Sequence, residues 1–208
     1  MSDTSQIAES RCMCGKVKLQ FLRPVPVFHA HCCCSSCRQA REWAASKGGP
    51  TVEQGPTMAY YFENDLAQLE PHALALLFAI KLREVGRTTR LVAKCCYSVL
   101  ALDHPFYDEN VVCVHANTCN LIAPRIQPLR RLFTTDWDVV YDGAMPPATD
   151  ALEDSEAMRE KFAGIIKRPI ERPAGIKLQD IFAQLPPATS LGLAESFRFR
   201  GQTRAVVG

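Results

Sequence analysis

The feature that most constrains this chain is the density of cysteines between residues 31 and 38. The segment from His31 to Arg38 reads HCCCSSCR. The spacing of Cys32, Cys34 and Cys37 allows one tight turn to direct three thiols at a common point. Proteins build tetrahedral thiolate zinc sites in this way, with zinc–sulfur bonds of about 2.3 Å. The segment therefore predicts a metal site, around which the rest of the chain is organised.

Two further cysteine pairs lie far apart in the chain. The first, Cys12 and Cys14, precedes Gly15, which can adopt the positive φ that a metal-binding turn often needs. The second is the adjacent pair Cys95 and Cys96. Because the first pair needs two more thiolates to complete a tetrahedron, we predict that the two pairs share one closed, structural zinc ion. Such a site closes a loop of roughly 80 residues and stabilises the fold through the metal.

The central segment offers only three ligands at metal-binding spacing. Three protein ligands with an open position are typical of a catalytic or substrate-binding zinc site. The alternative is a second closed site in which His31 or Cys33 is the fourth ligand, and the spacing does not decide between the two. Cys33 lies between two predicted ligands, so its side chain is expected to point away from the metal and to pack as a small buried residue.

Composition narrows the environment and the partners. The chain has 208 residues, ten cysteines and a formal net charge of +2. The N-terminal residues 1–6 are polar and lack the apolar segment of a secretory signal, so we expect a cytoplasmic protein whose thiols bind metal and do not form a disulfide framework. The near-neutral charge does not favour nucleic acid as a partner, and no apolar run approaches the roughly 20 residues that span a bilayer. The oligomeric state is left open.

The residue pattern predicts a mainly β domain over residues 11–145, preceded by a flexible arm over 1–10. Alternating or β-prone runs predict strands at 17–21, 59–62, 88–93, 111–115 and 136–141. Residues 39–46 are expected to form a short helix, and residues 72–82 fit either a buried helix or a buried strand. Pro146 and Pro147 mark the start of a C-terminal extension over 146–208, with helices at about 150–166 and 177–184.

Two residues outside the cysteines are candidates for the chemistry. His115 follows a predicted strand and could reach the open zinc as a proton carrier, or it could be an ordinary core histidine. Arg38 directly follows the central cysteines and could bind a substrate carboxylate, or it could simply cover the surface. Cys113 and Cys119 are interpreted as ordinary strand and loop cysteines.

Taken together, the motifs resemble those of the glutathione-dependent formaldehyde-activating enzyme family, which includes centromere protein V. The likeness covers roughly residues 11–140 and rests on CMCG at 12–15, CCCSSCR at 32–38 and the late cysteine pair. Family members have Cys-x-x-Cys-Gly in the third motif. Here Cys96 matches the second family cysteine and Cys95 takes the place of the first, which looks most like a branch of the family with an adjacent pair.

The resemblance implies a mainly β, Mss4-like β-tent zinc fold with one or two zinc ions per chain. It implies a closed zinc on Cys12, Cys14 and the late pair, and an open zinc on Cys32, Cys34 and Cys37. The implied activity is that of a carbon–sulfur lyase acting on the adduct of a glutathione-like thiol and a small carbonyl. In that interpretation Cys34 and His115 lie at the catalytic zinc, and Arg38 binds substrate. The alternative is a non-catalytic, zinc-stabilised binding module in the manner of Mss4 proteins or centromere protein V.

Overall fold

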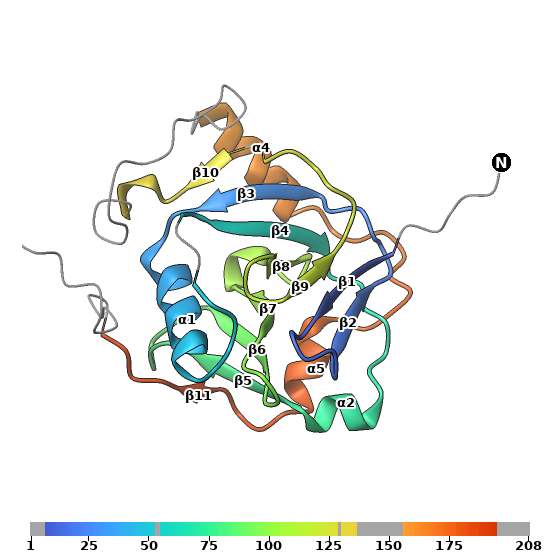
Figure 1. The fold of residues 1–208 in the computed structure, drawn as a ribbon. Helices are drawn as coiled ribbons and strands as arrows, with labels where there is room; N and C mark the ends of the chain where they lie inside the picture. Colours follow the sequence, from blue (N-terminus) through green and yellow to red (C-terminus); the bar gives the residue numbers. More distant parts are fainter. Residues whose placement is uncertain (1–6, 53–54, 129, 137–155, 195–208) are drawn as a thin grey trace, which may run out of the picture.

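The computed structural model describes residues 7–52, 55–128, 130–136 and 156–194, and it confirms a mainly β architecture (Figure 1). Within these residues, the larger of two sheets has eight strands in the order β10-β3-β4-β8-β7-β6-β5-β11. Their bounds are β3 Phe28–Cys32, β4 Thr57–Glu63, β5 Leu77–Lys81, β6 Thr89–Ala93, β7 Val99–Asp103, β8 Val111–His115, β10 Arg130–Leu132 and β11 Thr189–Ser190. Neighbouring strands are antiparallel except at the two edges, where β10 and β11 pair in parallel.

A smaller antiparallel sheet lies beside the first. Its strands follow the order β2-β1-β9, with bounds β1 Ala8–Arg11, β2 Lys18–Phe21 and β9 Asn120–Ile122. The helices in the described residues are α1 Ser35–Ser46, α2 Pro71–Ala75, α4 Glu156–Ile166 and α5 Leu178–Ala183, with short 3-10 turns η1 Pro105–Tyr107 and η2 Thr134–Asp136.

Strand alternation explains how the larger sheet is buried on both faces. Successive side chains of a strand point to opposite faces, so in β8 Val112 and Val114 share one face while Cys113 and His115 share the other. The first face packs against the smaller sheet and α5 in one hydrophobic core, to which Leu19 of β2 also belongs. The second face is the one on which the central cysteines lie.

Two helices cover that second face (Figure 1). Trp43 of α1 packs among apolar side chains of β5, β6 and β7. Phe162 of α4 lies 4.6 Å, centroid to centroid, from the ring of Phe28 in β3 and 5.3 Å from that of Tyr61 in β4. The second face of the larger sheet and these two helices therefore surround a common space.

Several sequence-based boundaries need correction. The flexible arm predicted over residues 1–10 does not extend to Ala8–Ser10, which belong to β1 and are buried in the middle of the smaller sheet. The sequence Ala-Glu-Ser has no strand signature of its own, and β1 exists because β2 and β9 pair with it on both sides. Residues 1–6 lie outside the described residues.

The ambiguous run at 72–82 divides into α2 and β5, with Leu76 between them. The helix expected to start at Gln39 starts at Ser35, four residues earlier. Of the strand predicted at 136–141, Asp136 is the last residue of η2 and residues 137–141 lie outside the described residues. The first residues of the helix predicted at 150–166 also lie outside them, although α4 ends at the predicted Ile166.

The described part of the predicted C-terminal extension belongs to the same packed body. Leu178 and Ile181 of α5 are fully buried in the core between the sheets, and β11 adds an edge strand beside β5. An isolated bridge joins Ile176 to Leu66 through two backbone hydrogen bonds of 2.8 Å. The segment therefore completes the core that residues 7–136 begin.

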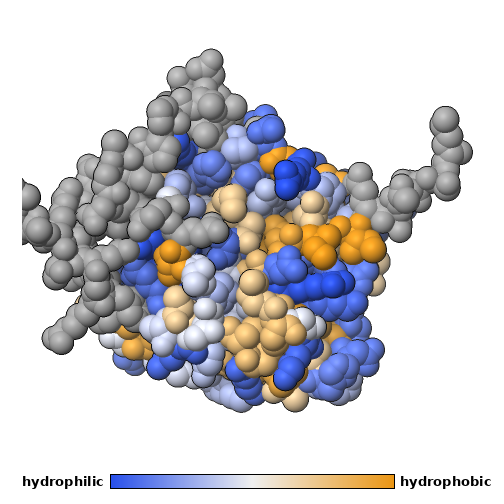
Figure 2. Space-filling view, in the orientation of Figure 1, coloured by the Kyte–Doolittle hydropathy of each residue, from blue (hydrophilic) through white to orange (hydrophobic). Residues whose placement is uncertain are grey.

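The exposed surface is mixed in character. Large apolar side chains with more than half of their surface exposed include Ile7, Met13 and Val25. On the face drawn in Figure 2, hydrophobic side chains form patches that are interrupted by hydrophilic ones. Among the described residues, no helix has the length and apolar character needed to cross a bilayer.

Candidate metal centres

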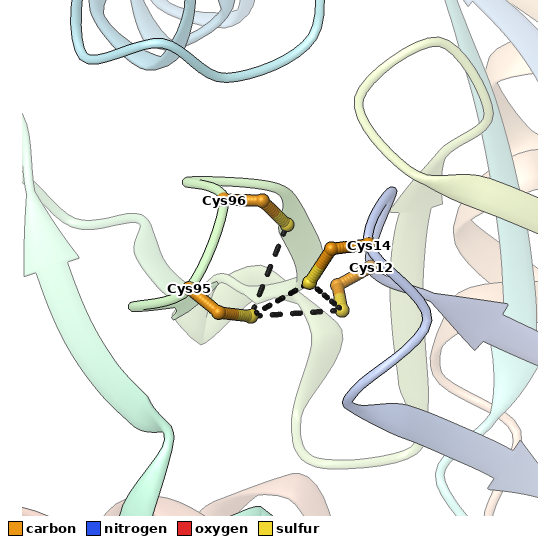
Figure 3. Close-up of side chains that lie close together, drawn as sticks. All are labelled: Cys12, Cys14, Cys95 and Cys96. Carbon is orange, nitrogen blue, oxygen red and sulfur yellow. Dashed lines mark hydrogen bonds between the residues drawn. The ribbon is translucent and has the colours of Figure 1, made fainter.

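The tips of two hairpins bring the distant cysteine pairs together. Cys12 and Cys14 lie in the turn between β1 and β2, and Cys95 and Cys96 lie in the turn between β6 and β7 (Figure 3). The four sulfurs lie within 4.8 Å of one another. Cys14 Sγ is 3.1 Å from Cys95 Sγ and 3.5 Å from Cys12 Sγ, and the Cys12–Cys95 separation is 3.8 Å. We call these four residues the outer cluster.

These distances fit a thiolate metal site. Zinc–sulfur bonds of about 2.3 Å at tetrahedral angles place sulfurs about 3.8 Å apart, close to the separations observed here. Cys12 is buried and Cys14 is exposed, while Cys95 and Cys96 are half-buried. The four thiols thus form a site at the surface with one ligand anchored in the core, and the prediction that the two pairs meet is consistent with the structure.

The local backbone explains how each turn presents two sulfurs. In the first turn Gly15 has φ 76°, a left-handed conformation that glycine adopts at no steric cost. In the second turn the same role falls to Tyr97, with φ 50°, whose backbone N–H donates to the Ala93 carbonyl at 2.9 Å. A side chain at positive φ is unfavourable, so Tyr97 carries the strain that lets an adjacent cysteine pair face one point.

Ser98 joins the two turns of the outer cluster. Its hydroxyl accepts a hydrogen bond from the Met13 backbone N–H at 2.9 Å and lies 3.2 Å from Cys96 Sγ. Burial raises the pKa of the Cys96 thiol, but hydrogen bonds with Ser98 and Cys14 outweigh it and lower the pKa to about 6. Burial raises the pKa of Cys12 and of Cys95. The cluster thus favours one thiolate even before a cation supplies further charge.

The central cysteines form a second group, the inner cluster of Cys32, Cys34 and Cys37. Cys32 is the last residue of β3, Cys34 is the N-cap of α1, and Cys37 lies in the first turn of that helix. Cys32 Sγ is 3.4 Å from Cys34 Sγ and 3.5 Å from Cys37 Sγ, and all three sulfurs lie within 4.8 Å of one another. These separations also fit a thiolate-bound metal.

The start of α1 explains the position of this cluster. Cys34 Sγ accepts a hydrogen bond from the Cys37 backbone N–H at 3.2 Å, so a cysteine does what Ser or Asp usually does at an N-cap. Hydrogen bonds from the Cys32 and Cys37 thiols hold the pKa of Cys34 well below its usual range. The positive end of the helix dipole favours the same thiolate.

His115 lies directly beside the inner cluster. β4 lies between β3 and β8. Cys32 of β3 pairs with Thr57 of β4, and His115 of β8 pairs with Ala59, which is two residues further along β4. His115 Nε2 is 3.6 Å from Cys37 Sγ, whereas its buried Nδ1 has no hydrogen-bond partner among the described residues. Burial and the nearby Arg90 guanidinium lower the pKa of His115 to about 3, so the imidazole is neutral at pH 7.

A cavity of about 880 Å³ opens onto all three sulfurs. We call it the cysteine cavity. The face of the larger sheet supplies Tyr61, Arg90, Cys113 and His115, and the other walls come from α1, α4, η1 and η2. Its volume lies within the range of roughly 300–1,000 Å³ of small-molecule sites. The inner cluster therefore has room for an additional ligand on its cavity side.

The other candidates from the sequence are distributed as follows. Cys33 is fully buried and is not part of either metal-binding group, and burial raises the pKa of its thiol to about 11. His31 is likewise outside the inner cluster. Arg38 is 3% exposed and its Nε donates to Glu42 Oε1 at 2.5 Å within α1, and it is not among the residues that line the cysteine cavity.

The arginine that does line the cavity, Arg90, comes from β6 and was not a sequence-based candidate. Leu91, the next residue of β6, lies in the core between the sheets, so strand alternation could have placed Arg90 on the opposite face of the sheet. It could not have indicated which residues surround Arg90 there. Tyr107, in η1, also lines the cavity and had no signal in the sequence. Comparisons with protein-family models, with curated proteins and with solved structures gave no match.

Proposed function

We propose that this chain is a two-zinc protein in which the outer cluster holds a structural zinc and the inner cluster holds a zinc that a small molecule can reach. The observation that carries the proposal is the difference between the clusters. The outer group offers four sulfurs, a complete tetrahedral set, whereas the inner group offers three sulfurs that face a cavity of about 880 Å³. Closed four-ligand sites are structural, and three ligands with an open position are typical of catalytic zinc.

We further propose the Mss4-like β-tent as the fold. A small antiparallel sheet and a larger, mostly antiparallel one, whose hairpin tips bring four cysteine sulfurs within 4.8 Å of one another, support this assignment. The motif resemblance covers the same hairpins. The fold by itself does not determine a reaction, so the function has to be argued from the inner cluster.

The proposed activity is carbon–sulfur lyase chemistry on the adduct of a glutathione-like thiol and a small carbonyl. When bound, zinc at such a site would stabilise a substrate sulfur as its thiolate and polarise a carbonyl oxygen. Arg90 places a positive charge beside Cys34 and Cys37, which favours an anionic sulfur cluster. His115 offers a neutral imidazole for moving a proton, and Tyr61 and Tyr107 bring hydroxyl groups to the same cavity.

Cobalt substitution tests whether the inner site is open. Cobalt bound by thiolates has visible absorption bands that report ligand number, so glutathione or 2-mercaptoethanol should change the spectrum of the wild type. Cys34→Ser should abolish that response and remove one metal ion from the total. Cys33→Ser is the matched control, because Cys33 is adjacent and buried but lies outside the cluster. Bands that no small thiol perturbs would identify a closed site, and a non-catalytic, zinc-stabilised binding module would then be the better assignment.

A further inference from the structure

A second, smaller pocket adjoins the cysteine cavity at the end of the β5–β6 hairpin. Its volume is about 240 Å³. Four residues line both spaces, so they are contiguous: Ser36, Thr88, Arg90 and His104. The remaining walls come from residues 82, 83 and 85–87 of the hairpin turn. We call this space the basic pocket.

The basic pocket concentrates positive charge without acidic compensation. Arg83, Arg87 and Arg90 all line it, and its lining contains no Asp or Glu. Glu84, in the same turn, is exposed and is not among the lining residues. Within the described residues, none of the three arginines forms an ion pair with a carboxylate.

Arg90 is the clearest case of a positive charge without a carboxylate partner among the described residues. It is 2% exposed, and its hydrogen bonds go to neutral acceptors, the Ser36 hydroxyl at 2.9 Å and two backbone carbonyls at 3.4 and 3.5 Å. Its buried Nε has no partner among the described residues. Arg83 is similar, because Nη2 donates to the Gln39 amide oxygen at 2.6 Å and to the Ala194 carbonyl at 3.0 Å, while its buried Nε has no described partner.

Burying a guanidinium is costly unless an anion and hydrogen-bond acceptors compensate it. The inner cluster would supply part of this compensation, since Cys34 and Cys37 lie close enough to Arg90 for thiolates bound to a metal there to interact with its charge. Three thiolates with one divalent cation carry a net charge of about −1, which a single arginine balances. Arg83 and Arg87 then remain as uncompensated positive charge in the adjoining basic pocket.

We propose that the basic pocket binds the oxyanion, a carboxylate or a phosphate, of a small ligand whose other end extends into the cysteine cavity. Guanidinium groups recognise both anions through paired N–H donors, so the pocket fixes the class of ligand as anionic. The inference rests on the proposed function only for the group at the far end of the ligand, where a thiol would face the inner cluster. It assigns anion recognition to the β5–β6 hairpin and not to Arg38.

The first arm of the test measures oxyanion binding without any thiol. Inorganic phosphate and acetate are titrated separately into the zinc-loaded protein by calorimetry. We expect binding of at least one of them, and Arg87→Gln and Arg83→Gln should each weaken it roughly fivefold, the effect of about one partly exposed ion pair. Arg87 is exposed, so its substitution should not impair folding. Arg125→Gln, an exposed arginine outside both pockets, is the control.

The second arm uses the cobalt-substituted protein and a series of thiols. Mercaptoacetate, 3-mercaptopropionate and 4-mercaptobutyrate are compared with neutral 2-mercaptoethanol, and the ratio of their affinities is read from the cobalt bands. We expect a preference of about tenfold for the carboxylate of the best length, which Arg87→Gln reduces and Arg125→Gln does not.

The two arms distinguish a failure of the anion-binding proposal from a failure of the open metal site. Oxyanion binding that depends on Arg87, without any change in the cobalt bands, supports the basic pocket and refutes the open metal site. Equal affinity for charged and neutral thiols, together with no Arg87-dependent binding of phosphate or acetate, overturns the anion proposal even if the metal site is open. Preference for phosphate over acetate, or the reverse, identifies which oxyanion the pocket accepts.

Discussion

Replacing Cys14 with serine separates the contribution of a metal bound at the outer cluster from that of core packing. Cys14 is exposed, so the change removes a ligand without opening a cavity, whereas Cys12 is buried in the core between the sheets. The hairpin tips would still be joined by the Met13–Ser98 hydrogen bond of 2.9 Å and by β1, where Ser10 Oγ donates to the Leu100 carbonyl at 2.7 Å. We therefore expect Cys14→Ser to fold but to be less stable.

The expected loss follows from metal linkage. A ligand that binds only the folded state stabilises it by about 4 kcal/mol when its free concentration is 1,000 times its Kd. Structural zinc in small peptide sites binds with roughly 10–16 kcal/mol, a Kd of about 50 nM to about 2 pM, so a few nanomolar free zinc meets that condition for a four-thiolate site at the tight end of this range. Losing one of four thiolates should remove most of this stabilisation by zinc. Cys14→Ser should therefore lower the free energy of unfolding by several kcal/mol when zinc is present, but by little after a chelator has removed it.

Urea unfolding at buffered free zinc, with and without a chelator, measures this difference. The Cys34→Ser background removes the contribution of the inner cluster, and elemental analysis should show two zinc ions in the wild type, one in each single variant and none in the double variant. Cys119→Ser is the control, since Cys119 is buried in the same core but lies outside both metal-binding groups. It should cost about 1 kcal/mol and retain the zinc dependence. If the Cys34→Ser, Cys14→Ser double variant retained the zinc dependence of Cys34→Ser alone, the outer cluster could not be a metal site.

Two further predictions concern packing and pH. Gly175→Ala should destabilise the fold by about 2 kcal/mol or more in urea unfolding, because a Cβ there would lie 2.0 Å from the Leu66 carbonyl oxygen. Gly164→Ala in α4 is the control and should be neutral or stabilising, because a Cβ there meets nothing within 4 Å. Equal effects of the two substitutions would count against the close packing of Gly175 on Leu66. His29 is buried, and burial lowers its pKa to about 4 against an ordinary value of 6.5. Between these two pH values the unfolded chain binds more protons than the folded one, so stability should fall as pH drops from 6.5 towards 4. His29→Phe, which keeps the stacking on Tyr60, should flatten that part of the pH profile of the urea midpoint. An unchanged slope would mean that His29 is not the group responsible.

The cysteine groups could be predicted from the sequence because ligand spacing is a local property. The pairing of Cys12 and Cys14 with Cys95 and Cys96 followed from counting thiolates, and the structure brings all four within 4.8 Å. An adjacent pair must direct both of its side chains at one ion. The structure accommodates it through the positive φ of Tyr97, which no composition rule assigns to a tyrosine.

The walls of the cysteine cavity could not be predicted, because they depend on the strand order of the sheet. Arg90, Tyr61 and His115 come from β6, β4 and β8, and only their registers place them on one face. The early start of α1 escaped prediction for a different reason. Cysteine is not a usual N-cap, so Cys34 was interpreted as a ligand alone, although its sulfur also accepts a hydrogen bond from the Cys37 N–H in the first turn of α1.

The β6–β7 hairpin links the two metal-binding groups mechanically. Its turn holds Cys95 and Cys96, and its opposite end holds Arg90, which pairs with Leu102 across the hairpin. Five residues of strand span about 17 Å, so the outer cluster and the cationic wall of the inner one are two ends of one element. A metal that fixes the turn therefore also restricts where the Arg90 guanidinium can lie. This connection gives a physical reason why a metal at the outer cluster would matter for the inner one, since the buried charge of Arg90 tolerates little displacement from the cysteines beside it.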